Sequence, residues 1–235
     1  MNIKHQWRYA YCVIGLCVGS AAWADFAATT NFTNNYVWRG LTQTDNNPAL
    51  QGSIQYNHES GLYAGLWGSN VDFLDVDGDT ATLEVDEYVG FNHAFENGFG
   101  VDLSYLYYSY PGTSGINFGE VVLKGSYDFL TLGVSYTNDY GGTGGDSLYY
   151  AADVAKEIPE KLAFGLSGFK ASAGVGYSDF DEIVGDNYID YRVGLTKAIT
   201  KIISVGIMGT TTDRNYLDSD VDEPHLIVNL SAALS

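Results

Sequence analysis

The sequence predicts an all-β protein, an up-and-down antiparallel transmembrane β-barrel of about twelve strands in a single domain. Three observations lead to this prediction. Apolar and polar residues alternate with a period of two, as in strands with one apolar and one polar face. Short and long connections alternate along the chain. After residue 24, no stretch has the length and apolarity of a membrane-spanning helix, and no helical periodicity is sustained.

Residues 1–24 have the pattern of a cleaved signal peptide. Lys4 and Arg8 provide a basic start, and a mostly apolar run without acids follows at 9–20. The small-x-small motif A-W-A then stands at 22–24, as signal peptidase requires. We therefore expect cleavage after Ala24, which leaves residues 25–235 as one outer-membrane barrel domain.

The composition is strongly acidic. The chain has 11 Lys and Arg against 29 Asp and Glu, and a net charge of −18. The expected leader removes Lys4 and Arg8 but no acid, which leaves nine bases against 29 acids, a charge of −20. Nucleic-acid binding is excluded because phosphate contacts need Lys and Arg. Cys12 and Cys17 both lie in the leader, so the mature chain has no disulfide and no thiolate metal site.

Residues 50–57 show the strand pattern clearly, with Leu50, Gly52, Ile54 and Tyr56 on one face and Gln51, Ser53, Gln55 and Asn57 on the other. The same alternation recurs at 131–139, 189–196 and 226–232. Strands are expected to begin near Asn31, Ala49, Leu62, Thr82, Gly100, Phe118, Leu130, Leu148, Lys161, Tyr188, Ile202 and His225.

The connections between these strands alternate in length. The short ones are 58–61, 96–98, 129–130, 157–160 and 198–201, and the long ones are 40–48, 71–81, 111–117, 138–147, 177–187 and 212–224. An even number of strands with short turns at one rim and long loops at the other is typical of transmembrane barrels. A soluble sandwich or lipocalin-like barrel is the alternative, because alternation alone does not show which face meets lipid.

Aromatic residues favour the membrane interpretation. Membrane barrels carry a girdle of aromatic rings at each interface. The expected girdles are Tyr56, Tyr63, Phe95 and Phe99 near short turns, and Tyr110, Tyr136, Tyr149, Tyr150 and Tyr188 near long loops.

Charged residues occur on the polar face of the expected strands. The set expected to line the lumen is Arg39, Glu84, Asp86, Asp102, Glu120, Lys124, Asp128, Asp153, Asp190 and Arg192. In the first strand, Trp38 shares a face with Phe32 and Tyr36, so we expect Trp38 at the outer interface and Arg39 inside. Seven acids against three bases, together with acidic long loops, should concentrate cations.

Several stretches resemble a known family. They are N-F-T-N-N-Y-V-W-R-G-L-T-Q-T-D-N-N-P-A-L-Q-G at 31–52, H-E-S-G-L-Y-A-G-L-W-G-S-N-V-D-F at 58–73, Y-L-Y-Y-S-Y-P-G at 105–112 and F-G-E-V at 118–121. They resemble the TorF-type porin family. This resemblance implies an outer-membrane barrel with a pore role and no known substrate or catalytic residues.

We therefore expect a channel for passive diffusion of small hydrophilic solutes, weakly cation-preferring, in the outer membrane of a Gram-negative bacterium. The alternative is a closed structural or receptor-type barrel, in which Arg39, Lys124 and Arg192 pair with carboxylates and plug the lumen. The expected partners are outer-membrane lipid and lipopolysaccharide, the barrel-assembly machinery and small hydrophilic solutes. No nucleic acid and no cofactor is expected.

Two motifs are considered for chemistry. D-V-D-G-D at 75–79 is similar to a calcium loop, but its glycine stands at the fourth position instead of the sixth. G-D-S-L at 145–148 and D-E-P-H at 222–225 resemble the nucleophile and base motifs of GDSL hydrolases. Those enzymes are α/β proteins, whereas this chain shows no βα alternation. A surface hydrolase is therefore a remote alternative, and no catalytic or metal-binding residue is expected.

Overall fold

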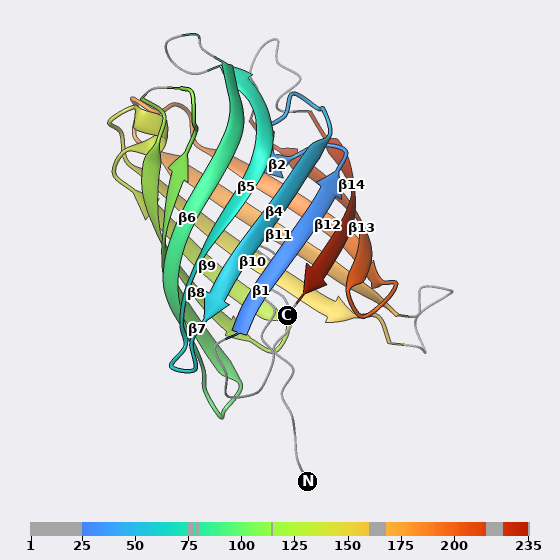
Figure 1. Ribbon diagram of the computed structural model, residues 1–235. Helices are drawn as coiled ribbons and strands as arrows, with labels where there is room; N and C mark the ends of the chain where they lie inside the picture. The colour runs from blue at the N-terminus through green and yellow to red at the C-terminus, as the bar shows by residue number, and fades with distance from the viewer. Residues whose placement is uncertain are drawn as a thin grey trace.

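A computed structural model of the chain describes residues 25–74, 78, 80–113, 115–159, 168–214 and 223–234. Among the described residues, twelve antiparallel strands form a closed barrel (Figure 1), and two short strands, which follow the first barrel strand in the chain, form a separate two-stranded sheet. The predicted barrel of twelve antiparallel strands is confirmed. Among the described residues, no helix is long and apolar enough to cross a membrane. The expected leader, residues 1–24, lies outside the described residues.

The elements in chain order are β1 (Asp25–Thr33), β2 (Val37–Trp38), β3 (Leu41–Thr42), β4 (Ala49–Asn57), β5 (Leu62–Leu74), β6 (Thr80–Ala94), β7 (Phe99–Ser109), β8 (Phe118–Tyr127), β9 (Leu130–Thr137), the 3₁₀ turn η1 (Tyr140–Gly142), β10 (Ser147–Glu157), β11 (Phe169–Phe180), β12 (Tyr188–Ala198), β13 (Ile203–Thr212) and β14 (His225–Leu234).

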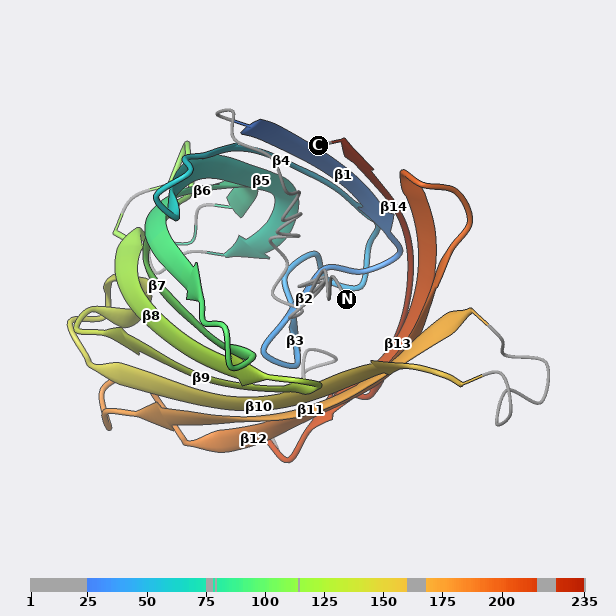
Figure 2. The same cartoon turned by 90° about the horizontal axis from the view of Figure 1, so that it is seen from below.

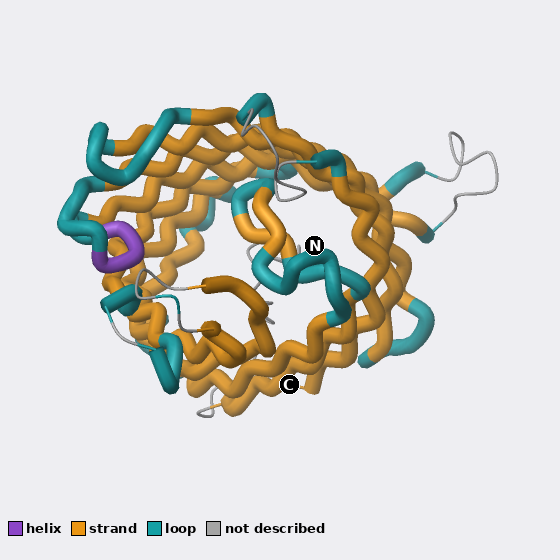
Figure 3. The backbone as a smooth tube through the Cα atoms, turned by 90° about the horizontal axis from the view of Figure 1, so that it is seen from above, coloured by secondary structure: helices purple, strands orange, loops and turns teal. Residues whose placement is uncertain are grey.

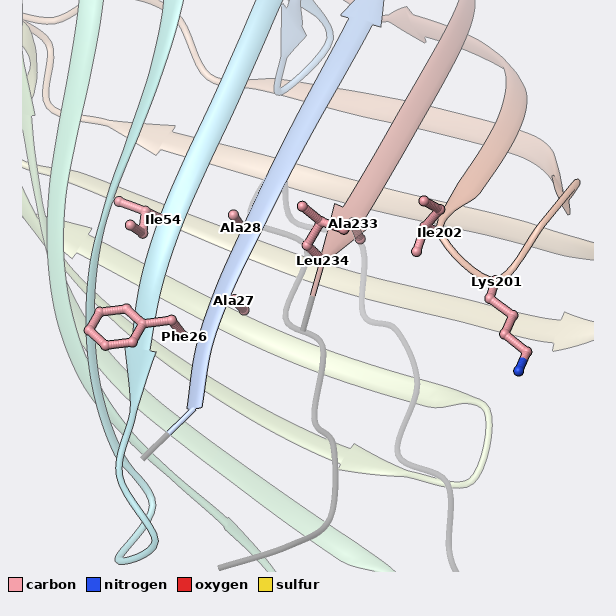
Figure 4. A pocket seen from close by; sticks show the side chains of 8 residues that line it. All are labelled: Phe26, Ala27, Ala28, Ile54, Lys201, Ile202, Ala233 and Leu234. Atoms are coloured by element: carbon pink, nitrogen blue, oxygen red, sulfur yellow. The ribbon is translucent and has the colours of Figure 1, made fainter. Parts of the chain in front are cut away.

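The barrel closes where its first strand meets its last. β1 pairs with β4 on one side and with β14 on the other, from Ala28 opposite Leu234 to Thr33 opposite Asn229. A groove follows the end of this seam, between β1, β14 and the turn before β13 (Figure 4). Its lining is apolar except for Lys201. The rim where residues 34–48 leave the wall is here called the loop rim, and the opposite rim the turn rim.

The two faces of the wall differ as the period-two pattern predicts. Large apolar side chains point outward and are exposed, which fits contact with hydrocarbon. Examples from around the barrel are Phe32, Leu50, Leu66, Val89, Leu103, Leu123, Leu132, Val175, Val193, Ile207 and Val228. Polar and charged side chains occupy the alternate positions and point inward.

The first strand ends earlier than the alternation suggests. β1 stops at Thr33, and residues 34–48 turn into the barrel, where β2 and β3 form a small hairpin (Figure 2). The expectation that Trp38 lies at the outer interface is therefore wrong. Trp38 lies inside, with its ring 5.8 Å from that of Tyr108. Consecutive asparagines at 34 and 35 break the strand before the aromatic residues that imitate its continuation.

The connection between β10 and β11 also differs from the prediction. A short turn at 157–160 and a strand beginning near Lys161 were expected, but β10 ends at Glu157 and β11 begins at Phe169. The strand begins where its neighbours can pair with it: Lys170 lies opposite Glu157, and Phe169 opposite Lys197. Residues 160–167 lie outside the described residues. The expected strand start at Lys161 falls among them.

Only part of the expected aromatic girdles faces outward. Tyr56, Phe95, Phe99, Tyr136 and Tyr150 are exposed. In contrast, Tyr63, Tyr110 and Tyr188 are buried inside, and Tyr149 contacts charged groups in the lumen. The assignment of these four to the girdles is wrong, because Tyr63, Tyr149 and Tyr188 have the inward parity of their strands and Tyr110 follows β7 into the interior.

On β5 and β6, each of two tyrosine rings lies over a glycine of the other strand. Tyr63 stands opposite Gly90, and Tyr88 opposite Gly65. A Cβ atom at Gly90 would meet the Tyr63 ring, and one at Gly65 would meet the Tyr88 ring. The rings thus cover backbone that a larger residue would push away, and Tyr63 keeps its hydroxyl 2.9 Å from a carboxylate oxygen of Asp102.

Replacing Gly90 by alanine tests this packing. Gly90→Ala should lower the free energy of unfolding by about 1–3 kcal/mol, because the Tyr63 ring must move and loses its bond to Asp102. The measurement is urea unfolding in detergent micelles, followed by tryptophan fluorescence. Gly52→Ala is the matched control, since its Cβ meets only the Thr29 carbonyl oxygen at 3.5 Å. Equal stability of both variants would contradict the packing.

Candidate functional site

Residues 34–48, here called the lumen hairpin, lie inside the ring of wall strands (Figures 2 and 3). Val37 pairs with Thr42 and Trp38 with Leu41, so Arg39 and Gly40 form a two-residue turn. Both have positive φ angles, 49° and 83°, as a type I′ turn requires. Asn-Gly is the usual pair in such turns, and a long side chain with positive φ is uncommon. The turn places Arg39 at the tip of the hairpin.

The hairpin is anchored to the wall where it begins. Asn34 continues the pairing of β1 with β14 through its side chain: its Nδ2 donates to the carbonyl of Leu226 at 3.0 Å, and its Oδ1 accepts from the amide of Val228 at 2.6 Å. Its backbone amide also donates to the carbonyl of Val228 at 3.2 Å, and the chain turns inward after this residue. The bend is therefore fixed at Asn34.

The base of the hairpin is held by its own polar side chains. The buried Asn35 accepts hydrogen bonds at Oδ1 from the hydroxyls of Thr42 and Thr44, at 2.6 and 3.2 Å, and donates to Asn46 Oδ1 at 2.9 Å. Asn46 has a left-handed backbone with φ 62°, a conformation that asparagine tolerates well. These bonds give the hairpin a defined shape of its own.

An ion pair joins the tip to the wall. Arg39 Nη2 lies 2.7 and 2.8 Å from the two carboxylate oxygens of Glu120 on β8, and the two side chains are 7% and 2% exposed. Tyr108 donates its hydroxyl to the same carboxylate at 3.1 Å. Arginine keeps its charge in proteins, and the Glu120 carboxylate compensates the burial of this guanidinium, so the pair is a buried ion pair.

Aromatic rings sandwich the guanidinium. Its carbon lies 4.2 Å from the ring centre of Trp38, on the hairpin, and 4.1 Å from that of Tyr149, on β10. Tyr188 on β12 donates its hydroxyl to the Arg39 carbonyl at 3.0 Å. Cation–π contacts of this kind are strongest where water is excluded. The tip is therefore held by β8, β10 and β12 together.

Gly40 packs so closely against the wall that no side chain would fit at this position. A Cβ atom there would meet Thr212 Cγ2 on β13 and lie 3.0 Å from Asp190 Cβ on β12. The positive φ and the close approach both require glycine. The tip thus crosses from the β1–β4 side of the barrel to the opposite wall.

The side of the hairpin that faces β5–β8 is filled by aromatic rings. Tyr36 meets Trp67 edge-on at 5.4 Å, and Trp38 stacks on Tyr140 at 6.1 Å. These residues belong to one buried apolar cluster, whose members include Tyr63, Val71, Tyr88, Leu106, Tyr108, Tyr110, Phe118 and Val122.

Around the hairpin, every wall strand contributes at least one inward side chain that is 8% exposed or less. The ring consists of Thr33, Gln51, Ser69, Glu84, Tyr108, Glu120, Thr137, Ser147, Ser178, Asp190, Thr210 and His225. An open passage at this level would leave part of the ring in contact with water. Among the described residues, the lumen hairpin and these side chains therefore fill the loop-rim half of the lumen.

The inward side chains are more exposed to solvent toward the turn rim. There the inward residues are partly exposed, including Thr29, Ser53, Asp102, Lys124, Thr131, Asp153, Ser172, Thr196 and Ser231. Among the described residues, the accessible part of the lumen thus lies on the turn-rim side of the lumen hairpin.

A second group of charges meets across β11. Arg192 on β12 lies 2.6 Å from Asp153 on β10 and 2.7 Å from Asp190. Gly174 stands between Asp153 and Arg192 in the strand register, and a Cβ there would collide with both side chains. Gly176 similarly leaves room for the Tyr149 ring, whose hydroxyl donates to Asp190 at 3.0 Å. The glycines of β11 let its two neighbours touch.

A third group of polar atoms lies on β6. Glu84, Asp86 and Tyr88 point inward at successive positions of the same face. Tyr110 donates its hydroxyl to Glu84 Oε1 at 3.2 Å. Among the described residues, Glu84 Oε2 forms no hydrogen bond although it is buried. This carboxylate thus meets the aromatic cluster through Tyr110.

The expected lumen charges fall in different places. Glu84, Asp86, Asp102, Glu120, Lys124, Asp153, Asp190 and Arg192 lie on the inner face of the wall, and Arg39 reaches the lumen from the hairpin. The expectation that Asp128 lines the lumen is wrong. Asp128 lies in the turn between β8 and β9, its side chain is 63% exposed, and its Oδ2 lies 3.7 Å from Lys156 Nζ. Its positive φ, 50°, marks a turn residue, so strand parity does not apply to it.

Sequence reasoning missed the aromatic partners of Arg39. Tyr108, Tyr149 and Tyr188 have the inward parity of their strands, which the sequence displays. The sequence around Arg39 carried a further signal, because Trp38 precedes it and Gly40 follows it. That pattern is typical of a tight turn more than of a wall strand.

The hydrolase motifs do not form a catalytic pair. Ser147 is buried on β10 and His225 on β14, with three strands between them in the barrel order. Within the described part of the chain, Ser147 Oγ has no hydrogen-bond partner. Asp222 lies outside the described residues, as do Asp75, Asp77 and Asp79 of the calcium-like motif. No group of three or more described His, Cys, Asp or Glu residues could hold a metal ion.

One protein-family model matches the chain over residues 18–231, described as "Bacterial protein of unknown function (Gcw_chp)". The chain belongs to this family. No curated protein matches the sequence.

Solved porin structures share the fold of this Gcw_chp protein. The KdgM porin matches with a TM-score of 0.54 at 11% identity, over 90% of this chain and 99% of that chain. The NanC porin matches with a TM-score of 0.55 at 11% identity, over 90% and 100%. The KdgM porin in complex with disordered oligogalacturonate gives 0.52 at 10%, over 90% and 99%. At such identities the likeness shows the barrel fold alone.

Replacing Gly40 tests the fit of the hairpin tip. Gly40→Ala should lower the free energy of unfolding by about 1–3 kcal/mol more than Gly112→Ala. Both glycines have positive φ, 83° and 94°, but a Cβ at Gly112 meets nothing within 4 Å. The control therefore carries the backbone strain without the collision. Urea unfolding in micelles gives the comparison, and equal losses would show that the tip does not press against β12 and β13.

Proposed function

We propose that this protein is a porin-like channel of the Gram-negative outer membrane, and that the described conformation is its closed state. It would pass small hydrophilic solutes by passive diffusion with a weak preference for cations, and it would catalyse no reaction. The observation that carries the proposal is the lumen itself: an inner face of polar and charged residues, interrupted by a hairpin that is separate from the wall.

The fold and the family support this proposal. A barrel with an apolar outer face suits the membrane, and two porins share its topology over nearly their whole length. We further propose that the chain is one of the TorF-type porins, with outer-membrane lipid, lipopolysaccharide and the barrel-assembly machinery as partners. The motifs at 31–52 and 58–73 support that narrower assignment.

The preference for cations follows from the inward charges. Of the positions named from the sequence, six inward residues are acidic and three are basic, after Asp128 is set aside. The acids are Glu84, Asp86, Asp102, Glu120, Asp153 and Asp190, and the bases Arg39, Lys124 and Arg192. A pore lined by an excess of negative charge concentrates cations.

Planar-bilayer recordings in asymmetric KCl measure this preference. The reversal potential should indicate cation selectivity, and Asp102→Asn should move it toward zero because one partly exposed inward charge is lost. Asp128→Asn removes an equal charge from an exposed turn and should change it far less. A reversal potential on the anion side would refute the cation preference.

A closed structural or receptor-type barrel is the second candidate, and the buried ring around the lumen hairpin favours it. The two functions differ in whether the lumen hairpin can move out of the lumen. A channel needs an equilibrium between closed and open states, whereas a closed barrel keeps the hairpin in place permanently.

Replacing Arg39 separates these candidates. Arg39→Ala leaves the carboxylate of Glu120 buried without its cation, which costs the closed state about 3 kcal/mol or more. The ratio of open to closed channels should then rise on the order of a hundredfold. Single-channel recording gives this ratio, with Lys156→Ala as a control that removes an exposed ion pair. Silence of both the parent protein and Arg39→Ala would favour the permanently closed barrel.

A further inference from the structure

Three side chains of the barrel wall bind a cation that does not belong to the wall. Glu120 on β8 supplies the carboxylate, Tyr149 on β10 an aromatic face and Tyr108 on β7 a hydroxyl bonded to that carboxylate. These three side chains, here called the cation surface, belong to the wall. The guanidinium that they bind, that of Arg39, belongs to the lumen hairpin and not to the wall.

The chemistry of the cation surface suits one class of guest. A carboxylate and an aromatic face together favour a planar, delocalised cation, which can form hydrogen bonds in its plane and stack across it. A hydrated metal ion gains little from the Tyr149 ring. A compact ammonium lacks the flat face that stacks at 4.1 Å. The guanidinium group meets both requirements.

Arg39 does not use the cation surface fully. Only Nη2 bonds to Glu120, at 2.7 and 2.8 Å, whereas the strongest pairing of this kind uses two nitrogens in parallel. Nη1 is buried and has no hydrogen-bond partner among the described residues, which is unfavourable. The positive φ of Arg39, 49°, adds backbone strain, because a long side chain rarely adopts it.

A guanidinium that is not tied to the hairpin would escape these restrictions. It could turn in the plane of the Glu120 carboxylate and bond through two nitrogens, while it keeps the face of Tyr149. An external guest can therefore compete with Arg39 for the cation surface. Its binding would leave the hairpin tip without its main attachment.

We propose that the cation surface of Glu120, Tyr108 and Tyr149 is a recognition site for guanidinium-bearing solutes, which Arg39 occupies as an internal ligand while the lumen is closed. A solute of this class binds in place of Arg39 and releases the hairpin. The effect on passage rests on the proposed channel function. The binding does not.

Isothermal titration calorimetry of the full chain in detergent micelles, with ethylguanidinium as the probe, tests the binding. Arg39→Ala should bind the probe at least tenfold more tightly than the parent protein, because the internal ligand is gone. Adding Glu120→Gln to Arg39→Ala should weaken binding at least tenfold, and adding Tyr149→Leu should also weaken it. Ethylurea, a neutral group of the same shape, should not bind.

The result that overturns the site is equal binding of ethylguanidinium to Arg39→Ala and to its Glu120→Gln double variant, or no binding to either. Should Arg39→Ala fail to fold, the parent protein provides the test. Ethylguanidinium should then bind the parent but not Tyr149→Leu, and equal binding to both would equally overturn the site.

Conductance separates this inference from the proposed function. In planar bilayers, ethylguanidinium added to the parent protein should increase the open fraction at least tenfold, and ethylurea should not. Binding in the calorimeter with no conductance in any variant would refute the channel and retain the site. Conductance that responds equally to ethylguanidinium and ethylurea would refute the site and retain the channel.

Discussion

The width of the barrel is the constraint on which the rest of the structure depends. About eight strands enclose a space that their own side chains can fill, whereas about sixteen to eighteen leave an aqueous channel. Twelve strands lie between these cases, so the interior must be completed by water or by more of the chain. In this protein both occur. The lumen hairpin occupies the half near the loop rim, and polar side chains face water in the other half.

Filling the lumen with a hairpin creates an interior in which charges meet without water. Arg39 and Glu120 attract each other strongly there, but neither tolerates burial alone. The described arrangement is therefore stable only when both are present, and the open state of the proposed channel requires both to be hydrated. Intermediate positions of the tip would bury one charge without the other. This favours two discrete states over a gradual change in width.

The barrel wall could be predicted from the sequence because its signal is repeated. Alternating faces and turns recur around the barrel, and an error at one position, such as the start of β11, does not alter the whole. The hairpin has no such support. Phe32, Tyr36 and Trp38 continue the alternation of β1, and only two asparagines and a glycine indicate that the strand has ended.

The contacts of the site were harder still to predict. Glu120 lies 81 positions after Arg39, and the pair forms only because the turn at Arg39 and Gly40 reaches across the barrel to β8. Strand parity placed most of the inward charges, since they belong to the wall. It could not place Asp128 in its turn, nor the partners of a residue that leaves the wall.

The glycines of β11 bear on recognition although they touch no guest. Gly176 lies beneath the Tyr149 ring, and Gly174 beneath the contact of Asp153 with Arg192. Side chains at these positions would lift the tyrosine from the wall and turn its flat face away from the lumen. The affinity of the neighbouring strands for a planar cation thus depends on volume that β11 leaves empty, and evolution could retune that affinity by substitutions that never contact the solute.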